Sequence, residues 1–368
     1  MSLFLSRLSL SKLSLRRHLT SRFFSSFIFE VEPCGSTLRD GDVGELAIFS
    51  YIDGELDFTD KKVPMDLVKE MGTIGASHGW VATLKNGVVR LQDDLDPRAS
   101  DTDPKRISLP PLVTLPHCQT QIVTNVAMSS SSPEDEECIV AVKFMGPQLS
   151  LCRPAQRDCK WTNIRITDPS FFFSHVMYSK RDEMFSMPAS GGNYTGSWDL
   201  GRHRHKPKLQ MLWYPEQRVV KDRYVKGLDE FARSKTVRKC EWRLFDSCSR
   251  MEYYLVESSE TGETFMVKWF TERNPRRKGR VKWEYFHVLR LDKEGNAVYT
   301  KDFGGICIFL SKAEPFCLPA ASLYDQRPNC IYYLDNHKVG IKCMDDPEYE
   351  TAVSDTCPAP YWFPPKLD

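Results

Sequence analysis

Short runs of apolar and β-branched residues, separated by turn residues, recur along most of the chain every ten to twenty residues. This is the pattern of short strands joined by turns. The strand candidates cover residues 138–144, 148–152, 161–166, 171–178, 183–187, 253–258, 264–270, 283–291, 297–300, 306–310, 330–334 and 339–343. Between residues 264 and 300 two long strands, the polar loop 272–280 and a further strand predict an antiparallel meander.

The clearest local signal is a hairpin over residues 79–91, in which Asn86-Gly87 stands between two apolar runs. Asn and Gly tolerate the positive φ angles that a two-residue hairpin turn requires. Val81 and Leu84 mark the first strand as half-buried. We therefore expect the ring of Trp80, on the same strand, to pack between two structural units.

Helical periodicity is scarce. Residues 215–235 form one candidate, interpreted as an insertion, whose apolar face would hold Val219, Val220, Tyr224, Leu228 and Phe231. A shorter candidate, residues 64–71, opens with Pro64, which suits a first helical turn. About 340 residues of short strands exceed a usual sandwich and fit about six or seven kelch-like blades of roughly 50 residues. The predicted fold is all-β: a kelch-like β-propeller with a short helical insertion.

The first 24 residues differ from the rest in composition, with eight Ser in residues 1–26, five Lys or Arg, and no acidic residue before Glu30. An Arg-rich, Ser-rich, acid-poor start is typical of an organellar transit peptide. Residues 22–26, Arg-Phe-Phe-Ser-Ser, resemble a mitochondrial processing site. The expected organisation is therefore a transit peptide over residues 1–24 and a single propeller over residues 28–368, in the mitochondrion, with plastid or dual targeting as the alternative.

Charge and hydropathy exclude two classes of function. The whole chain has 50 basic and 49 acidic residues, and the part after residue 24 is mildly acidic. Such a balance gives no electrostatic basis for general nucleic-acid binding. No run approaches the ~18 apolar residues of a membrane-spanning helix, so no membrane insertion is expected.

The twelve cysteines lie mostly beside apolar residues, so we expect reduced, buried thiols. The pairs Cys152 and Cys159, Cys240 and Cys248, and Cys307 and Cys317 lack zinc-finger or CxxC spacing. His203 and His205 would share one side of a strand, but the surrounding cations favour a solvated loop. No metal or cofactor is predicted.

Three further clusters are weighed in the same way. The cations of residues 276–280 concentrate positive potential, although a solvated hairpin tip is the favoured interpretation. Asp93, Asp94 and Asp96 are interpreted as turn residues ahead of Pro97. Gly191-Gly192-Asn193 lacks the spacing of a phosphate-binding loop and predicts a turn. No catalytic residue is predicted.

Several blocks match a known family in order. They are residues 77–84, 107–112, 141–144, 148–154, 187–192, 255–258, 262–269, 291–300 and 308–317. The chain from about Gly72 to Cys343 resembles the plant domain-of-unknown-function family 295, in its organellar branch. The resemblance implies a β-propeller related to the kelch-like propeller that follows an F-box in other plant members. No F-box is recognisable here, and the family supplies no catalytic residues.

Three functions fit these observations. The favoured one is a non-catalytic organellar propeller that acts as a protein-protein interaction scaffold, with a protein partner of unknown identity. The alternative is a propeller-fold hydrolase with carboxylates at the channel mouth, or an adaptor that lacks the F-box of its ubiquitin-ligase relatives. An RNA-binding factor using residues 202–208 with Trp213 and Tyr214 is disfavoured by the acidic balance.

Overall fold

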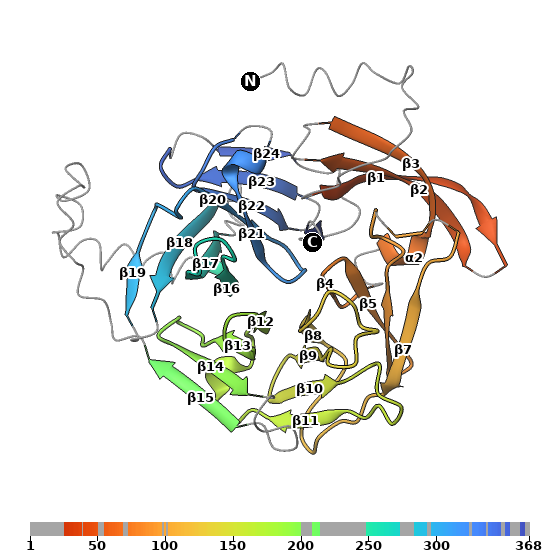
Figure 1. Cartoon of the computed structure of the whole chain (residues 1–368), viewed down its shortest axis with the longest axis horizontal. Helices are drawn as coiled ribbons and strands as arrows, with labels where there is room; N and C mark the ends of the chain where they lie inside the picture. The colour runs from red at the N-terminus through yellow and green to blue at the C-terminus, as the bar shows by residue number, and fades with distance from the viewer. Residues whose placement is uncertain are drawn as a thin grey trace.

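The computed structural model describes residues 26–38, 40–50, 55–68, 73–97, 99–100, 102–199, 208–213, 248–272, 283–292, 296–323, 326–335, 338–346, 350–353 and 361–364. Within them the strands form six sheets arranged as the blades of a ring, five with four strands and one with five (Figure 1). The predicted β-propeller is confirmed, and the blade number is six. No helix in these ranges is long and apolar enough to cross a membrane.

The blades follow the order of the chain. Blade I contains β25 (Trp362–Phe363), β1 (Ser26–Thr37), β2 (Gly41–Ser50) and β3 (Glu55–Pro64). Blade II contains β4 (Gly75–Ser77), β5 (Trp80–Lys85), β6 (Val88–Gln92) and β7 (Arg106–Pro111). Blade III contains β8 (Val123–Met128), β9 (Val140–Phe144), β10 (Gln148–Cys152) and β11 (Thr162–Arg165).

The second half of the ring is built in the same way until its last blade. Blade IV contains β12 (Met177–Ser179), β13 (Met184–Pro188), β14 (Tyr194–Asp199) and β15 (Lys208–Trp213). Blade V contains β16 (Cys248–Glu257), β17 (Thr264–Glu272), β18 (Trp283–Leu291) and β19 (Ala297–Tyr299). Blade VI contains β21 (Phe316–Pro319), β20 (Ile306–Leu310), β22 (Cys330–Asp335), β23 (Lys338–Cys343) and β24 (Glu350–Val353).

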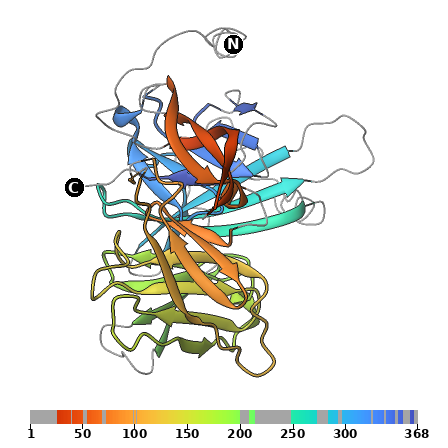
Figure 2. The ribbon, with the colours of Figure 1, turned by 90° about the vertical axis from the view of Figure 1, so that its right-hand side faces the viewer.

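The two ends of the propeller meet in blade I, where the C-terminal strand β25 pairs with β1. The indole nitrogen of Trp362 also donates a hydrogen bond to the Leu310 carbonyl in blade VI, at 3.0 Å. Figure 2 shows the ring from the side of blades I and II. The last strand therefore joins the C-terminal end of the propeller to its first blade and covers the start of the inner edge of β1.

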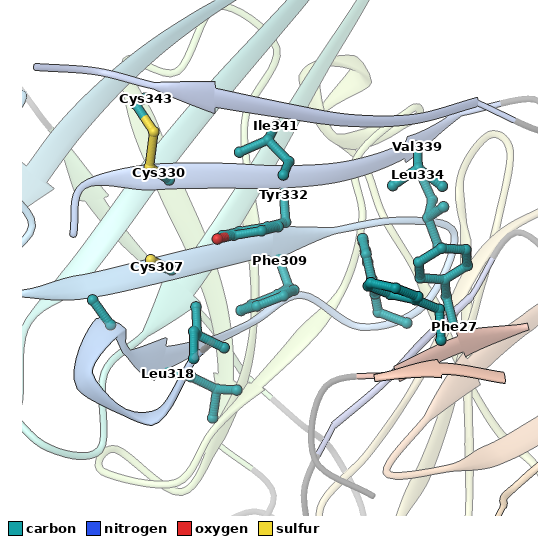
Figure 3. Packing of buried hydrophobic residues seen from close by; sticks show 14 residues of the cluster. Phe27, Cys307, Phe309, Leu318, Cys330, Tyr332, Leu334, Val339, Ile341 and Cys343 are labelled. Atoms are coloured by element: carbon teal, nitrogen blue, oxygen red, sulfur yellow. A yellow bond between two sulfur atoms is a disulfide. The ribbon is translucent and has the colours of Figure 1, made fainter. Parts of the chain in front are cut away.

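The apolar core is divided among the junctions between blades. Six clusters of buried residues occur in the described part of the chain, and each combines side chains of neighbouring blades. At the junction of blades VI and I, the ring of Phe309 stacks on that of Tyr332, with centroids 4.8 Å apart (Figure 3). It also contacts the ring of Trp362, with centroids 5.4 Å apart. The blades are therefore held side by side by face-to-face apolar packing.

The hairpin predicted for residues 79–91 is confirmed as β5 and β6, with φ of 52° at Asn86 and 75° at Gly87. Trp80 is 8% exposed and belongs to the cluster between blades II and III. Its indole nitrogen donates to the carbonyl of Ser131, which follows β8, at 3.1 Å. The predicted position of Trp80 between two blades is therefore also confirmed.

Other local predictions are partly wrong. The strand predicted over residues 171–178 is absent from residues 171–176: Phe171 ends a 3-10 helix, η1 (Pro169–Phe171), and residues 172–173 form a turn. Asp168 caps the start of η1 by accepting from the backbone amide of Ser170. Only Met177–Ser179 pairs as β12. The predicted helix of residues 64–71 is the short α2 (Met65–Val68): Pro64 ends β3 instead, and residues 69–71 lie outside the described residues. The candidate helix 215–235 and the transit segment 1–24 also lie outside them.

Blade VI departs from the regular blade because β21 is inserted on its inner side, which leaves β20 parallel to β22. The turn between β20 and β21, residues 311–315, is called the axial turn here, and it reaches the centre of the ring (Figure 1). A second short helix, η2 (Ala320–Ser322), follows β21. In the axial turn Ala313 bridges to Ala76 of blade II, and the Glu314 amide donates to the Ala76 carbonyl at 2.8 Å.

Candidate interaction surface

The inner ends of three blades converge on one carboxylate in the axial turn. Glu314 accepts hydrogen bonds from the hydroxyl of Ser77 at 2.6 Å and from the amide of Tyr178 at 2.9 Å. The amide of Met128 donates to it as well. Burial raises the pKa of Glu314 to about 7, although these donors oppose the rise by favouring the charged form. Because both oxygens are engaged by structural donors, Glu314 joins blades II, III and IV to blade VI.

Exposed apolar side chains gather at one end of blade III. Ile122 precedes β8, Met145 lies in the turn between β9 and β10, and Phe173 lies in the connection to blade IV; they are 53%, 39% and 65% exposed. Their segments are adjacent, because the Met145 amide donates to the Ile122 carbonyl at 2.9 Å. The amide of Gly146 likewise donates to the carbonyl of Phe172 at 3.0 Å. We call Ile122, Met145 and Phe173 the apolar arc.

A buried lysine fixes the segments that carry the arc. Lys143 has no exposed surface, and its ammonium donates to the carbonyls of Phe144, Gly146 and Phe172, the last two at 3.1 Å and 3.0 Å. Burial lowers the pKa of Lys143 to about 7, which the three carbonyl acceptors counteract. One side chain therefore ties the β9–β10 turn to the connection that carries Phe173.

Side-chain amides complete this support. The Gln119 amide nitrogen donates to the carbonyls of Ile122 and Met145, at 3.1 Å and 2.6 Å. Asn125, fully buried, donates to the carbonyl of Val176 at 2.7 Å and accepts from its amide at 2.9 Å. Loops held in this way lose little conformational entropy when a partner binds, so the arc is preorganised.

The sequence did not single out these residues. Lys143 lies among apolar residues on a strand, where alternation predicts a side chain directed to solvent. Ile122, Met145 and Phe173 have the composition of core residues. No sequence signal marked them as exposed: Phe173 fell within the strand predicted over residues 171–178, and Ile122 lies in no predicted strand.

The predicted turn residues are found in turns. The Asp96 amide donates to the Asp93 carbonyl at 2.9 Å, which closes the turn ahead of Pro97. Asp94 pairs with Arg106 at 2.6 Å, and Arg106 also bonds Asp40 in the β1–β2 turn, which ties blade II to blade I. These two carboxylates raise the pKa of the Arg106 guanidinium.

Gly191-Gly192-Asn193 forms the turn between β13 and β14, as predicted, with φ of 66° at Gly192. A Cβ there would lie 2.5 Å from the Cε of Lys268, whose ammonium donates to the Gly191 carbonyl at 2.7 Å. The turn therefore supports the junction of blades IV and V. His203, His205 and the basic residues 276–280 lie outside the described residues.

The prediction that all cysteines are reduced is wrong for Cys330 and Cys343, which form a disulfide (Figure 3). They occupy directly opposite positions on β22 and β23. Their separation of 13 residues matches no motif, so only the strand register brings them together. Cys152 and Cys159 are thiols with their sulfurs 3.0 Å apart. The thiol of Cys307 donates to the Arg327 carbonyl at 3.0 Å, and that of Cys317 donates to the Glu257 carbonyl at 3.3 Å. Cys240, and the side chain of Cys248, are outside the described residues.

Within the described residues, no group of three or more His, Cys, Asp or Glu side chains is arranged to hold a metal.

The model of the KIB1-4 beta-propeller family matches residues 49–350 of this chain. The chain belongs to this family. The match covers nearly the whole ring, so the KIB1-4 propeller of this chain includes both the apolar arc and the axial turn.

No curated protein sequence matches the chain. The N-terminal domain of Nup159 is similar in structure, with 8% identity and a TM-score of 0.31, over 76% of this chain and 66% of that one. A Lactobacillus plantarum protein has 7% identity and a TM-score of 0.40, over 92% and 98% of the two chains. A putative 6-phosphogluconolactonase from Bacteroides fragilis has 8% identity and a TM-score of 0.38, over 96% and 100%.

Proposed function

We propose that this KIB1-4 propeller is a non-catalytic scaffold that binds a protein partner through the apolar arc. The observation that carries the proposal is the combination of exposure and rigidity: three exposed apolar side chains stand on segments fixed by Lys143 and Gln119. Isolated exposed apolar residues are ordinary, whereas neighbouring ones on preorganised loops are typical of interaction sites. The uncharged arc suits a protein segment that presents apolar side chains.

The alternative, a hydrolase with carboxylates at the channel mouth, needs a carboxylate free to move a proton or attack a substrate. Glu314 is the carboxylate at the inner ends of blades II, III and IV, and its oxygens accept from Ser77 and Tyr178. Asp168 is similarly engaged by Ser170 and Tyr194, at 2.7 Å each. These contacts favour the scaffold over the hydrolase. They are equally compatible with an adaptor that lacks an F-box.

The proposed compartment is the mitochondrion, with plastid or dual targeting as the alternative, and the support is the acid-free Arg/Ser composition of residues 1–24. We expect the native protein to begin near Ser25. Sequencing the N-terminal peptide of the protein purified from tissue tests this. An N-terminus at Met1 or Ser2 would contradict it.

The scaffold proposal is tested by placing charges in the arc. Ile122→Asp and Phe173→Asp together should reduce at least tenfold the recovery of one or a few proteins by proximity labelling in isolated organelles, because a buried carboxylate is costly in an apolar interface. Val298→Asp, at a 43% exposed position in blade V, is the matched control and should leave the recovery unchanged.

Both variants should retain the melting temperature of the unmodified protein, since all three positions are exposed. Recovery of the same proteins at the same yield from the arc variant would contradict the proposal. Light scattering measures whether the partner is a second copy of the chain. A dimer that the arc substitutions dissociate would also contradict the proposal of a different protein partner.

A further inference from the structure

Two thiols meet at the end of blade III opposite the apolar arc. Cys152 ends β10, and Cys159 precedes β11 after a loop that contains two consecutive turns. The Gln156 amide donates to the Arg153 carbonyl at 3.3 Å, and the Cys159 amide donates to the Gln156 carbonyl at 3.1 Å. These turns bring the Sγ atoms of Cys152 and Cys159 to 3.0 Å.

The distance is short for two thiols and leaves about 1 Å to the ~2.05 Å of a disulfide bond. The connecting loop is short and turned by its own backbone hydrogen bonds, so the two thiols are held near each other. Cys138 packs in the same cluster as Cys152, so a third thiol lies nearby. Cys152 and Cys159 are therefore a preformed pair, and Cys138 is a second thiol that competes with Cys159 for a bond to Cys152.

The two thiols differ in access. Cys152 is 3% exposed, and burial raises the pKa of its thiol, with the neighbouring Cys159 adding to the rise. Cys159 is partly exposed and can be reached from solvent. Since the thiolate is the reacting form, a reagent in solution meets Cys159 first. Cys152 is then placed to react with whatever is attached to Cys159.

We propose that Cys152 and Cys159 form a modification site for low-molecular-weight disulfides such as glutathione disulfide. The thiolate of Cys159 attacks one sulfur of glutathione disulfide, which forms a mixed disulfide and releases one glutathione thiolate. Cys152 then gives up its proton and attacks the sulfur of Cys159, which releases the second glutathione. Two protein thiols are oxidised, glutathione disulfide is reduced, and the two protons end on the two glutathiones.

The bond would join the end of β10 to the start of β11 and leave the apolar arc at the other end of the blade untouched. The inference is therefore independent of the proposed function. Closing a loop of this size removes freedom from the unfolded chain, so we expect oxidation to raise the melting temperature by a few degrees.

The test uses the full chain, equilibrated with mixtures of reduced glutathione and glutathione disulfide, alkylated and digested for mass spectrometry. We expect the peptide linked through Cys152 and Cys159 to accumulate as the disulfide fraction rises. Cys118→Ser, at another partly exposed free cysteine, is the matched control and should not change this accumulation. Cys152→Ser should instead retain glutathione on Cys159.

Three results would overturn the proposal. One is a native protein in which both thiols remain fully alkylated in excess glutathione disulfide. Another is glutathione retained on Cys159 in the unmodified protein without a link to Cys152. The third is a link from Cys152 to Cys138. All three are read from the unmodified chain, so they do not depend on the folding of a variant.

Discussion

Blade III and blade VI show two ways of building one unit of the same ring. In blade III each strand pairs with its neighbour in the chain, and a buried lysine holds its turns. Blade VI contains the parallel pair β20 and β22, the axial turn and the disulfide. Blade III is assembled from local hairpins, whereas blade VI is held by contacts that are distant in sequence. Blade VI therefore holds the ring together, whereas blade III carries the apolar arc, which we propose as the binding surface.

The largest expected effect concerns the core of blade VI. Phe309→Ala should lower the free energy of unfolding by about 3–5 kcal/mol, because the ring stacks on Phe316 and Tyr332 and contacts Trp362 of blade I. The matched variant in blade III is Phe144→Ala, also fully buried, which should cost less. Equilibrium denaturation measures both, and an equal or larger loss for Phe144→Ala would contradict the comparison.

The disulfide should stabilise blade VI by about 3 kcal/mol, since it closes a loop of 13 residues. Replacing both Cys330 and Cys343 by Ala should lower the denaturation midpoint by a corresponding amount, and reductant should do the same to the unmodified protein. Without reductant, at most ten of the twelve cysteines should react with a thiol reagent after unfolding. Twelve reactive thiols would show that the pair is reduced.

The two blades should also differ in pH dependence. The pKa of Glu314 is raised from 4.5 to about 7 in the folded protein. The folded state therefore binds the proton of the Glu314 carboxyl more tightly than the unfolded state does. As pH rises from 4.5 to about 7, loss of this proton lowers the free energy of unfolding by up to about 3 kcal/mol. Glu314→Gln should remove this fall, which shows as a difference between the two stability profiles. Parallel profiles over that range would contradict the expectation.

Lys143 in blade III should act in the opposite direction. Its pKa is lowered from 10.5 to about 7, so its contribution raises stability as pH rises between these values. Lys143→Met should remove this rise. At pH 7 the variant should also be less stable by about 1–3 kcal/mol, because the carbonyls of Phe144, Gly146 and Phe172 lose the hydrogen bonds from the ammonium. Lys85→Met, at an exposed position, is the control and should stay within about 0.5 kcal/mol.

Much of the regular part of the fold was predictable from local pattern. β10, β18 and β20 have the bounds that the apolar runs predict, and Asn86-Gly87 turns the hairpin as expected. The long strands of blade I were not predicted, because charged residues interrupt their apolar positions. Residues 171–176 were wrongly predicted as a strand, since the 3-10 helix that Asp168 caps runs to Phe171 and the chain turns at Phe172 and Phe173.

The candidate site was much less predictable. The sequence shows Lys143 as a strand lysine and Phe173 as one of three consecutive Phe, yet the first is fully buried and the second is 65% exposed. Exposure depends on which segments meet at the junction of blades III and IV. No periodicity along a single strand contains that information.

The sequence by itself determined the all-β class, the hairpin over residues 79–91, the meander over residues 264–300 and the position of Trp80, because these depend on alternation and turn chemistry within a few residues. The tertiary structure alone decided which side chains from different strands and blades contact each other. Cys330 meets Cys343 through strand register, and Glu314 meets Ser77 through ring closure across 237 residues. Such contacts form only when the fold brings distant segments together. Patterns within a few neighbouring residues therefore cannot predict them.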